Sequence, residues 1–236
     1  MNGTFPSEER DVSVSIPVKG VKLQGTLNIP GDARGLVLFA HGTGSSRHSP
    51  RNRYVASVLR EGGLATLLFD LLTEEEEAID LRTRHLRFDI NLLGERLVAV
   101  TDWLRERPDT GTLSIGYFGA STGAGAALVA AARRPGAVGA VVSRGGRPDL
   151  ASAALPAVSA PTLLIVGGYD LPVIEMNREA LGRLRVEKEL VIVPGATHLF
   201  EEPGTLEEVA RLARHWFEHH LASVAEEQKA TKGPVA

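Results

Sequence analysis

Apolar and polar residues follow two different patterns along the chain. Near its start, "DVSVSIPVKGVKLQGTLNIP" (residues 11–30) alternates apolar and polar positions on both sides of Lys19-Gly20. Alternation with a period of two is typical of strands with one face in solvent, and a short break containing glycine is typical of a hairpin turn. We therefore predict two antiparallel edge strands joined at Lys19-Gly20.

Further along, the apolar residues form short continuous runs instead. Such runs indicate strands that are buried on both faces, as in a parallel sheet covered by helices. Six of them are "GLVLFA" (35–40), "LATLLFD" (64–70), "LSIGYF" (113–118), "AVGAVVS" (137–143), "TLLIVG" (162–167) and "ELVIVP" (189–194).

Segments with helical spacing separate these runs. Within residues 88–106, one stripe that we expect to face the core consists of Phe88, Leu92, Leu93, Leu97, Val100, Trp103 and Leu104, whereas Glu95 and Arg96 fall among the polar positions. Further helices are predicted over 51–60, 121–134, 173–184 and 205–221, the last opening at Thr205 with Glu208 at the spacing of a capping box. Strand and helix alternate, so the fold class is α/β, with a mostly parallel, doubly wound sheet.

Two stretches invite other interpretations. Residues 110–132 carry no charge and could span a bilayer by length, but glycines and hydroxyls interrupt them, which favours a buried strand followed by a buried helix. The acidic run "TEEEEAID" (73–80) lies in a crossover. Neighbouring carboxylates are usually solvated, so we assign this run no metal and no function.

Length and composition set the frame for function. We expect a single domain over residues 1–224 and a frayed tail over 225–236, whose sequence is charged and ends in Gly and Pro. A net charge of −3 gives no reason to expect nucleic acid or an anionic membrane as a partner, which leaves small molecules. The first residues contain no apolar core of the kind that a signal peptide needs, so we expect a cytoplasmic protein.

Chemically capable residues follow four of the predicted strands. Because ligands bind at the carboxyl ends of the strands in an open parallel sheet, these positions are the natural place for a site. The segments are "HGTGSSRH" after 35–40, "GASTG" after 113–118, "GYD" after 162–167 and "GATHLF" after 189–194.

Ser121, Asp170 and His198 occur in the chain order of the α/β-hydrolase triad. With "HGTGSS", "GYFGASTGAG", "VGGYD" and "GATHLF" at the expected strand ends, the sequence resembles that superfamily over nearly its whole length. Within it, the chain is similar to the dienelactone-hydrolase-like branch, whose members are compact and have no large lid domain. Dienelactone hydrolases use a cysteine nucleophile, and this chain has no cysteine, so the resemblance implies a serine in that role.

Each member of this constellation has a chemical task. His198 would remove the proton of the Ser121 hydroxyl, which is a poor nucleophile without a base, while Asp170 would orient the imidazole. The resemblance implies that the negative oxygen of the tetrahedral intermediate binds to the backbone N–H groups of Thr43 and Thr122.

Other roles remain open for the same residues. Ser121 could be a small helix N-cap, His198 a buried structural histidine, and Asp170 a carboxylate that caps the helix after Pro172. Asp149 competes with Asp170 as the acid, since it follows the preceding strand. Three other histidines lie on the last predicted helix and are expected at the surface, namely His215, His219 and His220.

The substrate pocket is less well defined by the sequence. His41 is expected to brace the oxyanion loop, and four further residues that follow strand ends could line the pocket: Arg47, His48, Arg144 and Arg147. Glu201 and Glu202 stand where dienelactone hydrolases carry an arginine for the carboxylate of their substrate. We therefore expect a carboxylic ester or lactone as substrate rather than dienelactone itself.

The predicted activity is hydrolysis of small esters or lactones through an acyl-enzyme, without metal or cofactor. Only 18 residues, 144–161, separate two of the predicted strands, which leaves no room there for a large lid and favours short-chain substrates. Two alternatives remain open. The same acyl-enzyme could serve an acyltransferase or perhydrolase, and an α/β-hydrolase fold could also be a non-catalytic binding protein.

Overall fold

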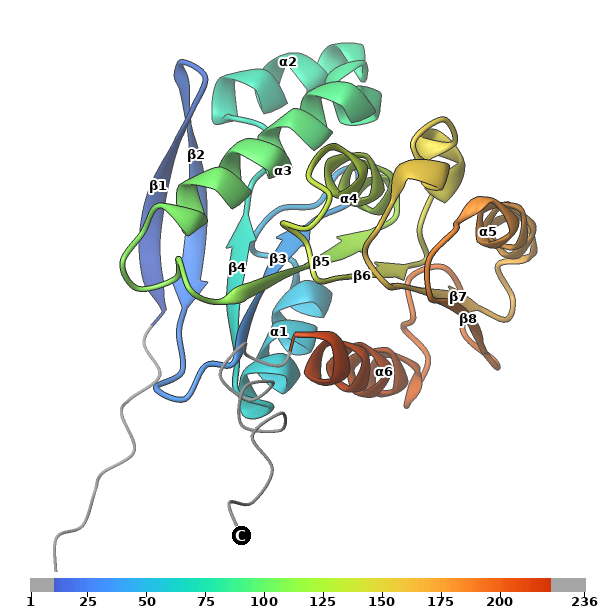
Figure 1. Ribbon diagram of the computed structural model, residues 1–236. Coiled ribbons are helices and arrows are strands. Elements are labelled where there is room, and N and C mark those ends of the chain that lie inside the picture. Colours follow the sequence, from blue (N-terminus) through green and yellow to red (C-terminus); the bar gives the residue numbers. More distant parts are fainter. Residues whose placement is uncertain (1–10, 222–236) are drawn as a thin grey trace, which may run out of the picture.

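The computed structural model describes residues 11–221, and within this range it contains one sheet of eight strands between two layers of helices (Figure 1). The strands are β1 (Val12–Val18), β2 (Val21–Asn28), β3 (Gly35–Ala40), β4 (Leu64–Phe69), β5 (Ser114–Ala120), β6 (Ala140–Arg144), β7 (Thr162–Gly167) and β8 (Lys188–Val193). Their order in the sheet is β1-β2-β4-β3-β5-β6-β7-β8. Strands β3 to β8 are parallel, and β1 and β2 are antiparallel to their neighbours. The predicted α/β fold class is therefore confirmed.

Two large hydrophobic clusters and a small third one fill the space between the sheet and its helices. The α-helices are α1 (Pro50–Glu61), α2 (Glu74–Thr83), α3 (Ile90–Arg105), α4 (Thr122–Arg133), α5 (Leu171–Arg183) and α6 (Thr205–His220). Three short 3₁₀ helices join them, η1 (Leu86–Phe88), η2 (Pro148–Ala151) and η3 (Leu155–Ala157). One large cluster packs under α3 and α4, and the other lies under α1 and α6 on the opposite face of the sheet (Figure 1). The small cluster lies under α5.

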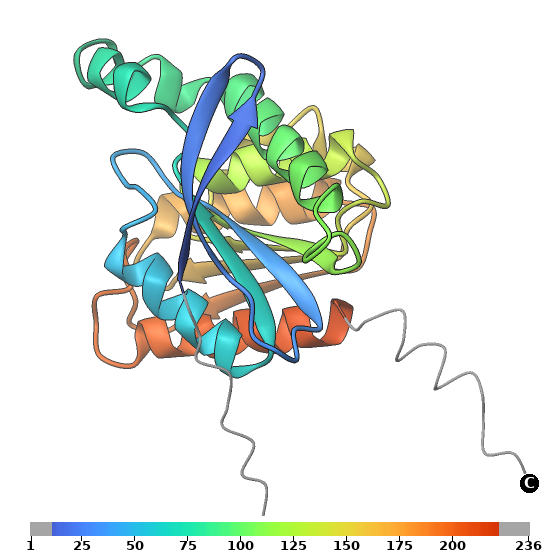
Figure 2. The same cartoon turned by 90° about the vertical axis from the view of Figure 1, so that its left-hand side faces the viewer.

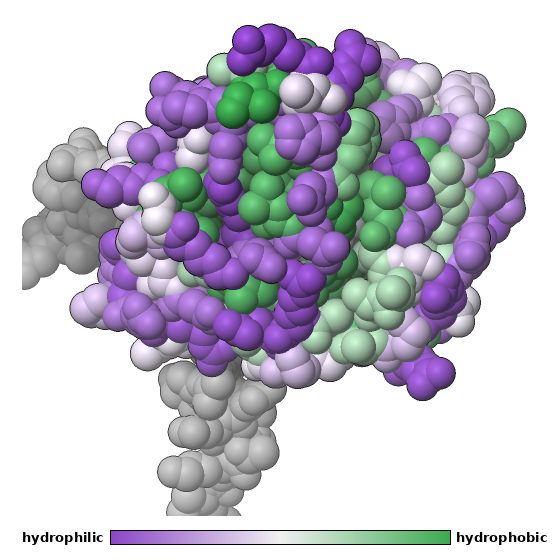
Figure 3. Space-filling model, turned by 90° about the horizontal axis from the view of Figure 1, so that it is seen from above, coloured by the Kyte–Doolittle hydropathy of each residue, from purple (hydrophilic) through white to green (hydrophobic). Residues whose placement is uncertain are grey.

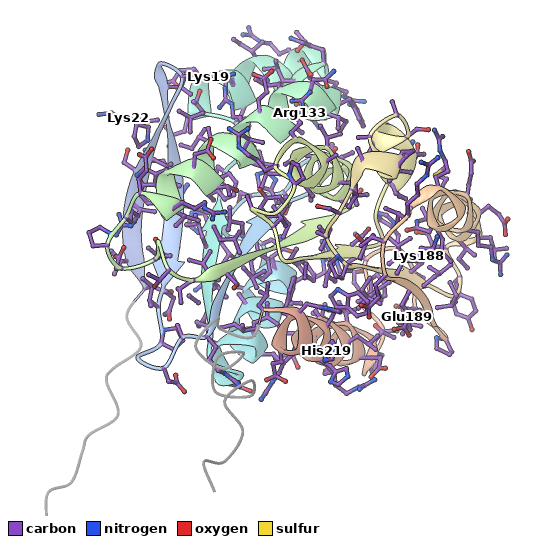
Figure 4. The ribbon with its side chains drawn as sticks, viewed as in Figure 1. Lys19, Lys22, Arg133, Lys188, Glu189 and His219 are labelled. Atoms are coloured by element: carbon purple, nitrogen blue, oxygen red, sulfur yellow. The ribbon has the colours of Figure 1, made fainter. Side chains whose placement is uncertain are left out.

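The N-terminal hairpin turns at Lys19-Gly20, as its pattern predicts. Both residues have a positive φ, 39° and 87°, which is the geometry of a two-residue hairpin turn. Lys19 Nζ lies 2.7 Å from Glu95 Oε2 of α3, and Figure 4 shows Lys19 at the tip of the hairpin. Of the two hairpin strands, however, only β1 lies at an edge of the sheet. Strand β2 also pairs with β4, so the prediction of two edge strands is wrong for β2.

The continuous apolar runs form buried strands with one exception. Strands β3, β4, β6 and β7 are buried at every position, and β5 at all but its first. Strand β8 is exposed or half-buried along most of its length, because it lies at the sheet edge and pairs only with β7. The uncharged stretch forms β5 and α4, and no helix among residues 11–221 is long and apolar enough to cross a membrane.

The crossover between β4 and α3 differs most from its sequence prediction. The acidic run forms α2, and the capping box of the chain is found there: Thr73 Oγ1 accepts from the Glu76 N–H, and Glu76 Oε2 accepts from the Thr73 N–H. At α6, by contrast, the N-cap is Gly204, and the Thr205 hydroxyl donates to Glu202 O. The predicted capping box at Thr205 is therefore wrong.

Two residues of the predicted helix 88–106 have the opposite burial from that predicted. Phe88 is 51% exposed, because the chain leaves the helical path at η1 before α3 begins at Ile90. Arg96 is buried and lies 2.5 Å from Glu76 Oε1 of α2, so a charged pair attaches α2 to the body of the protein. The tail predicted over 225–236 lies outside the described residues.

Candidate active site

Ser121 occupies a sharp turn between β5 and α4. Its φ is 51° and its ψ is −123°, a conformation that L-residues rarely adopt. The turn is possible because its neighbours lack side chains. A Cβ on Gly123 would lie 2.1 Å from Ala40 O, and one on Gly119 would lie 2.4 Å from Ala124 Cα. The sequence Gly-x-Ser-x-Gly therefore produces a strained strand-to-helix turn of the kind in which α/β-hydrolases carry their nucleophile.

His198 and Asp170 meet across the ends of two neighbouring strands. Asp170 follows β7, His198 follows β8, and Nδ1 of His198 lies 2.6 Å from Oδ2 of Asp170. Asp170 stands at the N-cap position of α5, but its side chain makes no capping hydrogen bond. The geometry therefore gives this carboxylate to His198 rather than to the helix. The Asp170 side chain is 13% exposed and that of His198 is 38% exposed.

The end of β6 lies next to both Ser121 and His198. The Ser121 N–H donates to Arg144 O at 3.2 Å, and the next residue, Gly145, has a φ of 51°. A Cβ on Gly145 would lie 3.5 Å from His198 Nδ1, so the imidazole packs directly against this backbone. Among the described residues, the Ser121 hydroxyl has no hydrogen-bond partner. It is brought to the same strand end as His198 but is not bonded to it in this conformation.

Asp149 and the histidines of α6 do not take part in this arrangement. Arg147 binds both carboxylate oxygens of Asp149, at 2.8 and 2.7 Å. His215 and His219 are exposed as predicted. His220 is not, because its ring packs 4.4 Å from that of Trp216 and its side chain is only 10% exposed.

The loop after β3 is held in place by His41. Nε2 of His41 accepts from the Leu71 N–H at 3.0 Å, and Nδ1 lies 3.0 Å from Gly42 O, so Nδ1 carries the proton that this bond needs. Burial lowers the pKa of His41, which favours this neutral form. His41 thereby ties the loop to the end of β4.

Thr43 and Thr122 contact each other. The Thr43 N–H donates to Thr122 Oγ1 at 3.1 Å, and the two hydroxyl oxygens are 3.0 Å apart. Thr122 is the first residue of α4, where backbone N–H groups have no partner within the helix. In this conformation the Thr122 hydroxyl therefore occupies the N–H of Thr43, while the N–H of Thr122 remains free for an oxyanion.

A cavity of about 120 Å³ opens beside this loop. It is lined by the loop itself, by the segment after β4 and by α2; its fourteen residues include Gly42, Thr43, Thr122, Leu71 and Leu81. Ser121 and His198 do not line it, so the cavity lies beside the reacting groups rather than around them. Figure 2 shows α2 projecting past the sheet on the same side as the loop that precedes α1.

Of the five residues predicted to line the pocket, only His41 lines this cavity. Arg47 is bonded to Asp70 through its side chain and its N–H, and Arg147 is bonded to Asp149. His48 is exposed and lines a separate groove. The side chains of Arg47, His48 and Arg147 thus point to partners or solvent outside the cavity. Arg144 is buried and does not line it either.

Arg144 has an unusual environment. It is only 7% exposed, and its Nε and Nη1 atoms have no hydrogen-bond partner among the described residues. Burial, and to a lesser extent the nearby charge of Arg51, lowers its pKa to about 10. Arg51 itself pairs with Glu201 at 3.1 Å. Arg144 therefore holds a buried positive charge at the end of β6.

Sequence reasoning missed the acidic and apolar residues of the β4–α3 crossover. Glu77, Asp80 and Leu81 all line the cavity, yet the sequence pattern of the acidic run 73–80, which contains Glu77 and Asp80, predicts only a solvated crossover. A signal was present, since Thr73 and Glu76 have the spacing of a capping box, which marks the start of a helix. The segment between β6 and β7 forms η2 and η3 and carries no large lid, as predicted.

Comparison with known proteins supports one family assignment. Residues 29–225 match the sequence model of the dienelactone hydrolase family. A crystal structure of a dienelactone hydrolase from Anabaena variabilis is 68% identical; the match covers 91% of this chain and 100% of that one, with a TM-score of 0.90. Est1E from Butyrivibrio proteoclasticus, at 17% identity and a TM-score of 0.73 over 88% of this chain and 98% of its own, shares the fold. The α/β-hydrolase fold is thereby confirmed.

The curated relatives carry a different name. A Mycobacterium tuberculosis protein that is provisionally named a phosphoribosyl transferase is 60% identical over 212 residues. This match covers 90% of the chain but only 47% of the relative. The chain thus spans about half the length of the curated relatives that it matches.

Proposed function

Because the chain belongs to the dienelactone hydrolase family, we propose that it hydrolyses carboxylic esters or lactones of small molecules through an acyl-enzyme formed on Ser121. The observation that carries this proposal is the 2.6 Å contact between His198 Nδ1 and Asp170 Oδ2 at the strand ends next to the strained Ser121 turn. A carboxylate on Nδ1 leaves Nε2 to accept the serine proton.

The proposed reaction uses each part of the site in turn. Nε2 of His198 takes the proton from the Ser121 hydroxyl as the oxygen attacks the ester carbonyl carbon, and the carbonyl oxygen becomes negative. The Thr122 N–H, at the start of α4, stabilises this oxygen, and the Thr43 N–H joins when the Thr122 hydroxyl turns away. His198 then gives its proton to the leaving alcohol. A water molecule, activated by the same imidazole, releases the acid.

The proposed sequence begins with a hydrogen bond from the Ser121 hydroxyl to His198. The absence of a Ser121–His198 hydrogen bond among the described residues does not conflict with the proposal, because such bonds are often long until substrate binds. The proposal is supported by the end of β6, where the Ser121 N–H bonds to Arg144 O and the imidazole of His198 packs on Gly145.

Hydrolysis is favoured over acyl transfer by the exposure of His198. Its side chain is 38% exposed, so water reaches the base that would activate it. An acyltransferase or perhydrolase must direct the acyl group to another acceptor, and comparing products with and without an added alcohol or peroxide separates these activities. The name of the curated relatives refers to proteins of which this chain matches only 47%, so that activity is not carried over to this chain.

The test is turnover of p-nitrophenyl acetate and butyrate by the wild type and by Ser121→Ala. We expect the variant to lose at least about a thousandfold in kcat/KM, since removing a triad nucleophile costs several orders of magnitude. Equal rates for the two proteins would overturn the nucleophile. A folded wild type that hydrolyses no ester and retains ligand binding would support the non-catalytic alternative.

A further inference from the structure

The cavity beside the oxyanion loop is small and mostly apolar. Four leucines from three segments line it, Leu71, Leu72, Leu81 and Leu93. Its volume of about 120 Å³ is somewhat less than the roughly 150 Å³ of a cavity that holds benzene. It therefore has room for an apolar group of up to about five carbons.

The position of the cavity indicates which half of an ester it would hold. Gly42, Thr43 and Thr122 line it, and a Cβ on Gly42 would lie 2.9 Å from the Ser121 Cβ, so the cavity adjoins the nucleophile on the oxyanion side. The leaving alcohol has to lie near His198, which protonates it, and His198 is not part of the cavity. The group in the cavity is thus the acyl chain.

The charges around the cavity leave one carboxylate without a counter-ion. Asp70 is paired with Arg47, and Asp80 is paired with Arg87. Glu77 also lines the cavity, and its carboxylate has no hydrogen bond or ion pair among the residues that the structure describes. Since the neutral form of His41 is favoured, the cavity carries a net negative charge from Glu77.

We propose that this cavity selects short, uncharged acyl groups and that Glu77 disfavours acyl groups that end in a carboxylate. The inference rests on the proposed function, whose acyl-enzyme it extends to a substrate class. A second carboxylate placed in this small cavity would lie close to Glu77 and be repelled by it. The leucines add an apolar wall that a charged group cannot solvate.

Helix α2 is the source of this selectivity. It contributes Glu77, Asp80 and Leu81, and it is attached to the body through the Glu76–Arg96 pair and the capping box at Thr73. Leu81 is 67% exposed and forms the outer wall of the cavity. In the top view of Figure 3, apolar surface is exposed among charged side chains, and Ile79 and Phe88, on α2 and η1, are also largely exposed.

The test compares two p-nitrophenyl esters whose acyl chains both have five carbons. One is the neutral pentanoate, and the other is the anionic monoester of glutaric acid. The rate of spontaneous hydrolysis is subtracted for each. We expect the wild type to prefer the pentanoate by at least about tenfold in kcat/KM. Glu77→Gln should narrow this ratio by about fivefold, and high salt should narrow it in the wild type. Glu75→Gln, on the same helix but outside the cavity, is the matched control and should leave the ratio unchanged.

A second pair of variants tests the size of the cavity. Leu81→Ala should raise the octanoate rate relative to the butyrate rate, because it removes the outer wall, and Ile79→Ala should not, since Ile79 does not line the cavity. Both residues are exposed, so both variants are expected to fold.

The results separate this inference from the function on which it rests. Equal turnover of both five-carbon esters, or an unchanged ratio in Glu77→Gln, would overturn the selectivity while leaving the hydrolase intact. If neither these esters nor p-nitrophenyl acetate were hydrolysed, the proposed function would fail first, and the inference with it.

Discussion

The two sides of Ser121 are built differently. On the β6 side, the neighbours are strand ends and a buried guanidinium: His198 packs on Gly145, and Arg144 is 7% exposed with a lowered pKa. On the oxyanion side, the neighbours are a loop and a surface helix, and the charges are carboxylates such as Glu77. The first side consists of strand ends with the His198–Asp170 pair and a buried arginine, whereas the second is largely apolar and carries the unpaired carboxylate of Glu77.

The groups proposed for catalysis and the groups proposed for substrate selectivity therefore lie on different parts of the fold. The groups proposed to move protons lie where parallel strands end, and strand ends are fixed by the hydrogen bonds of the whole sheet. The groups proposed to recognise the acyl chain lie on α2, which contacts the rest of the protein mainly through one ion pair and its neighbouring segments. Such a helix can change its residues without disturbing the catalytic geometry.

The largest expected effect concerns the acid on the β6 side. Asp170→Asn should reduce kcat by about 10³- to 10⁴-fold, because an amide on Nδ1 favours the wrong imidazole tautomer. Asp149→Asn is the control, since Asp149 is bound by Arg147 and does not reach His198. Turnover of p-nitrophenyl butyrate checks both. If Asp149→Asn lost most of its kcat and Asp170→Asn lost none, Asp149 rather than Asp170 would be the acid of the triad.

A smaller effect is expected from the glycines that shape the serine turn. Gly123→Ala should destabilise the protein by about 3 kcal/mol or more, because its Cβ would meet Ala40 O at 2.1 Å, where only backbone can yield. Gly182→Ala, in α5 with no atom within 4 Å of the added Cβ, should instead stabilise by up to about 1 kcal/mol. Urea unfolding measures both. The same sign in the two variants would show that the turn is not under this constraint.

The smallest expected effect lies on the oxyanion side and depends on pH. The pKa of His41 is lowered from its ordinary value of 6.5 by burial, so the unfolded chain binds a proton more readily than the folded protein. The contribution of His41 to stability is therefore fully present above pH 6.5 and is lost as the pH falls below it. His41→Gln should lose less stability than the wild type between pH 7.5 and pH 5.5 in urea unfolding.

The exposed His215 provides the control for this measurement. His215→Gln makes the same substitution at an exposed position and reports what replacing a histidine by glutamine does on its own. An identical slope for His41→Gln and the wild type would contradict the buried, neutral state of His41.

The sheet and the strand-end residues could be predicted from the sequence because their signals are local and strong. Continuous apolar runs mark strands buried on both faces, and Gly119 and Gly123 mark a turn that no other residue type fits. The contact of Asp170 with His198 follows from the parallel order, which brings the ends of β7 and β8 together.

The rest could not be predicted, because it depends on contacts between distant parts of the chain. An amphipathic stripe does not show that Arg96 is buried, since only the packing of α2 provides Glu76 as its partner. The pocket arginines show the same limit. Arg47 and Arg147 do follow strand ends, as predicted. Their ion-pair partners Asp70 and Asp149, however, decide where their side chains point. The edge position of β8 likewise follows only from the strand order.

The central claim is that Ser121 is the nucleophile, and covalent labelling tests it most directly. The wild type, Ser121→Ala and His198→Gln would each be treated with a fluorophosphonate at neutral pH, and the labelled peptide would be identified by mass spectrometry. The account predicts one label per chain on Ser121, lost activity in proportion to the label, no label in Ser121→Ala and much slower labelling in His198→Gln. A wild type that hydrolyses esters and stays unlabelled at Ser121, or is labelled at another residue with loss of activity, would contradict it.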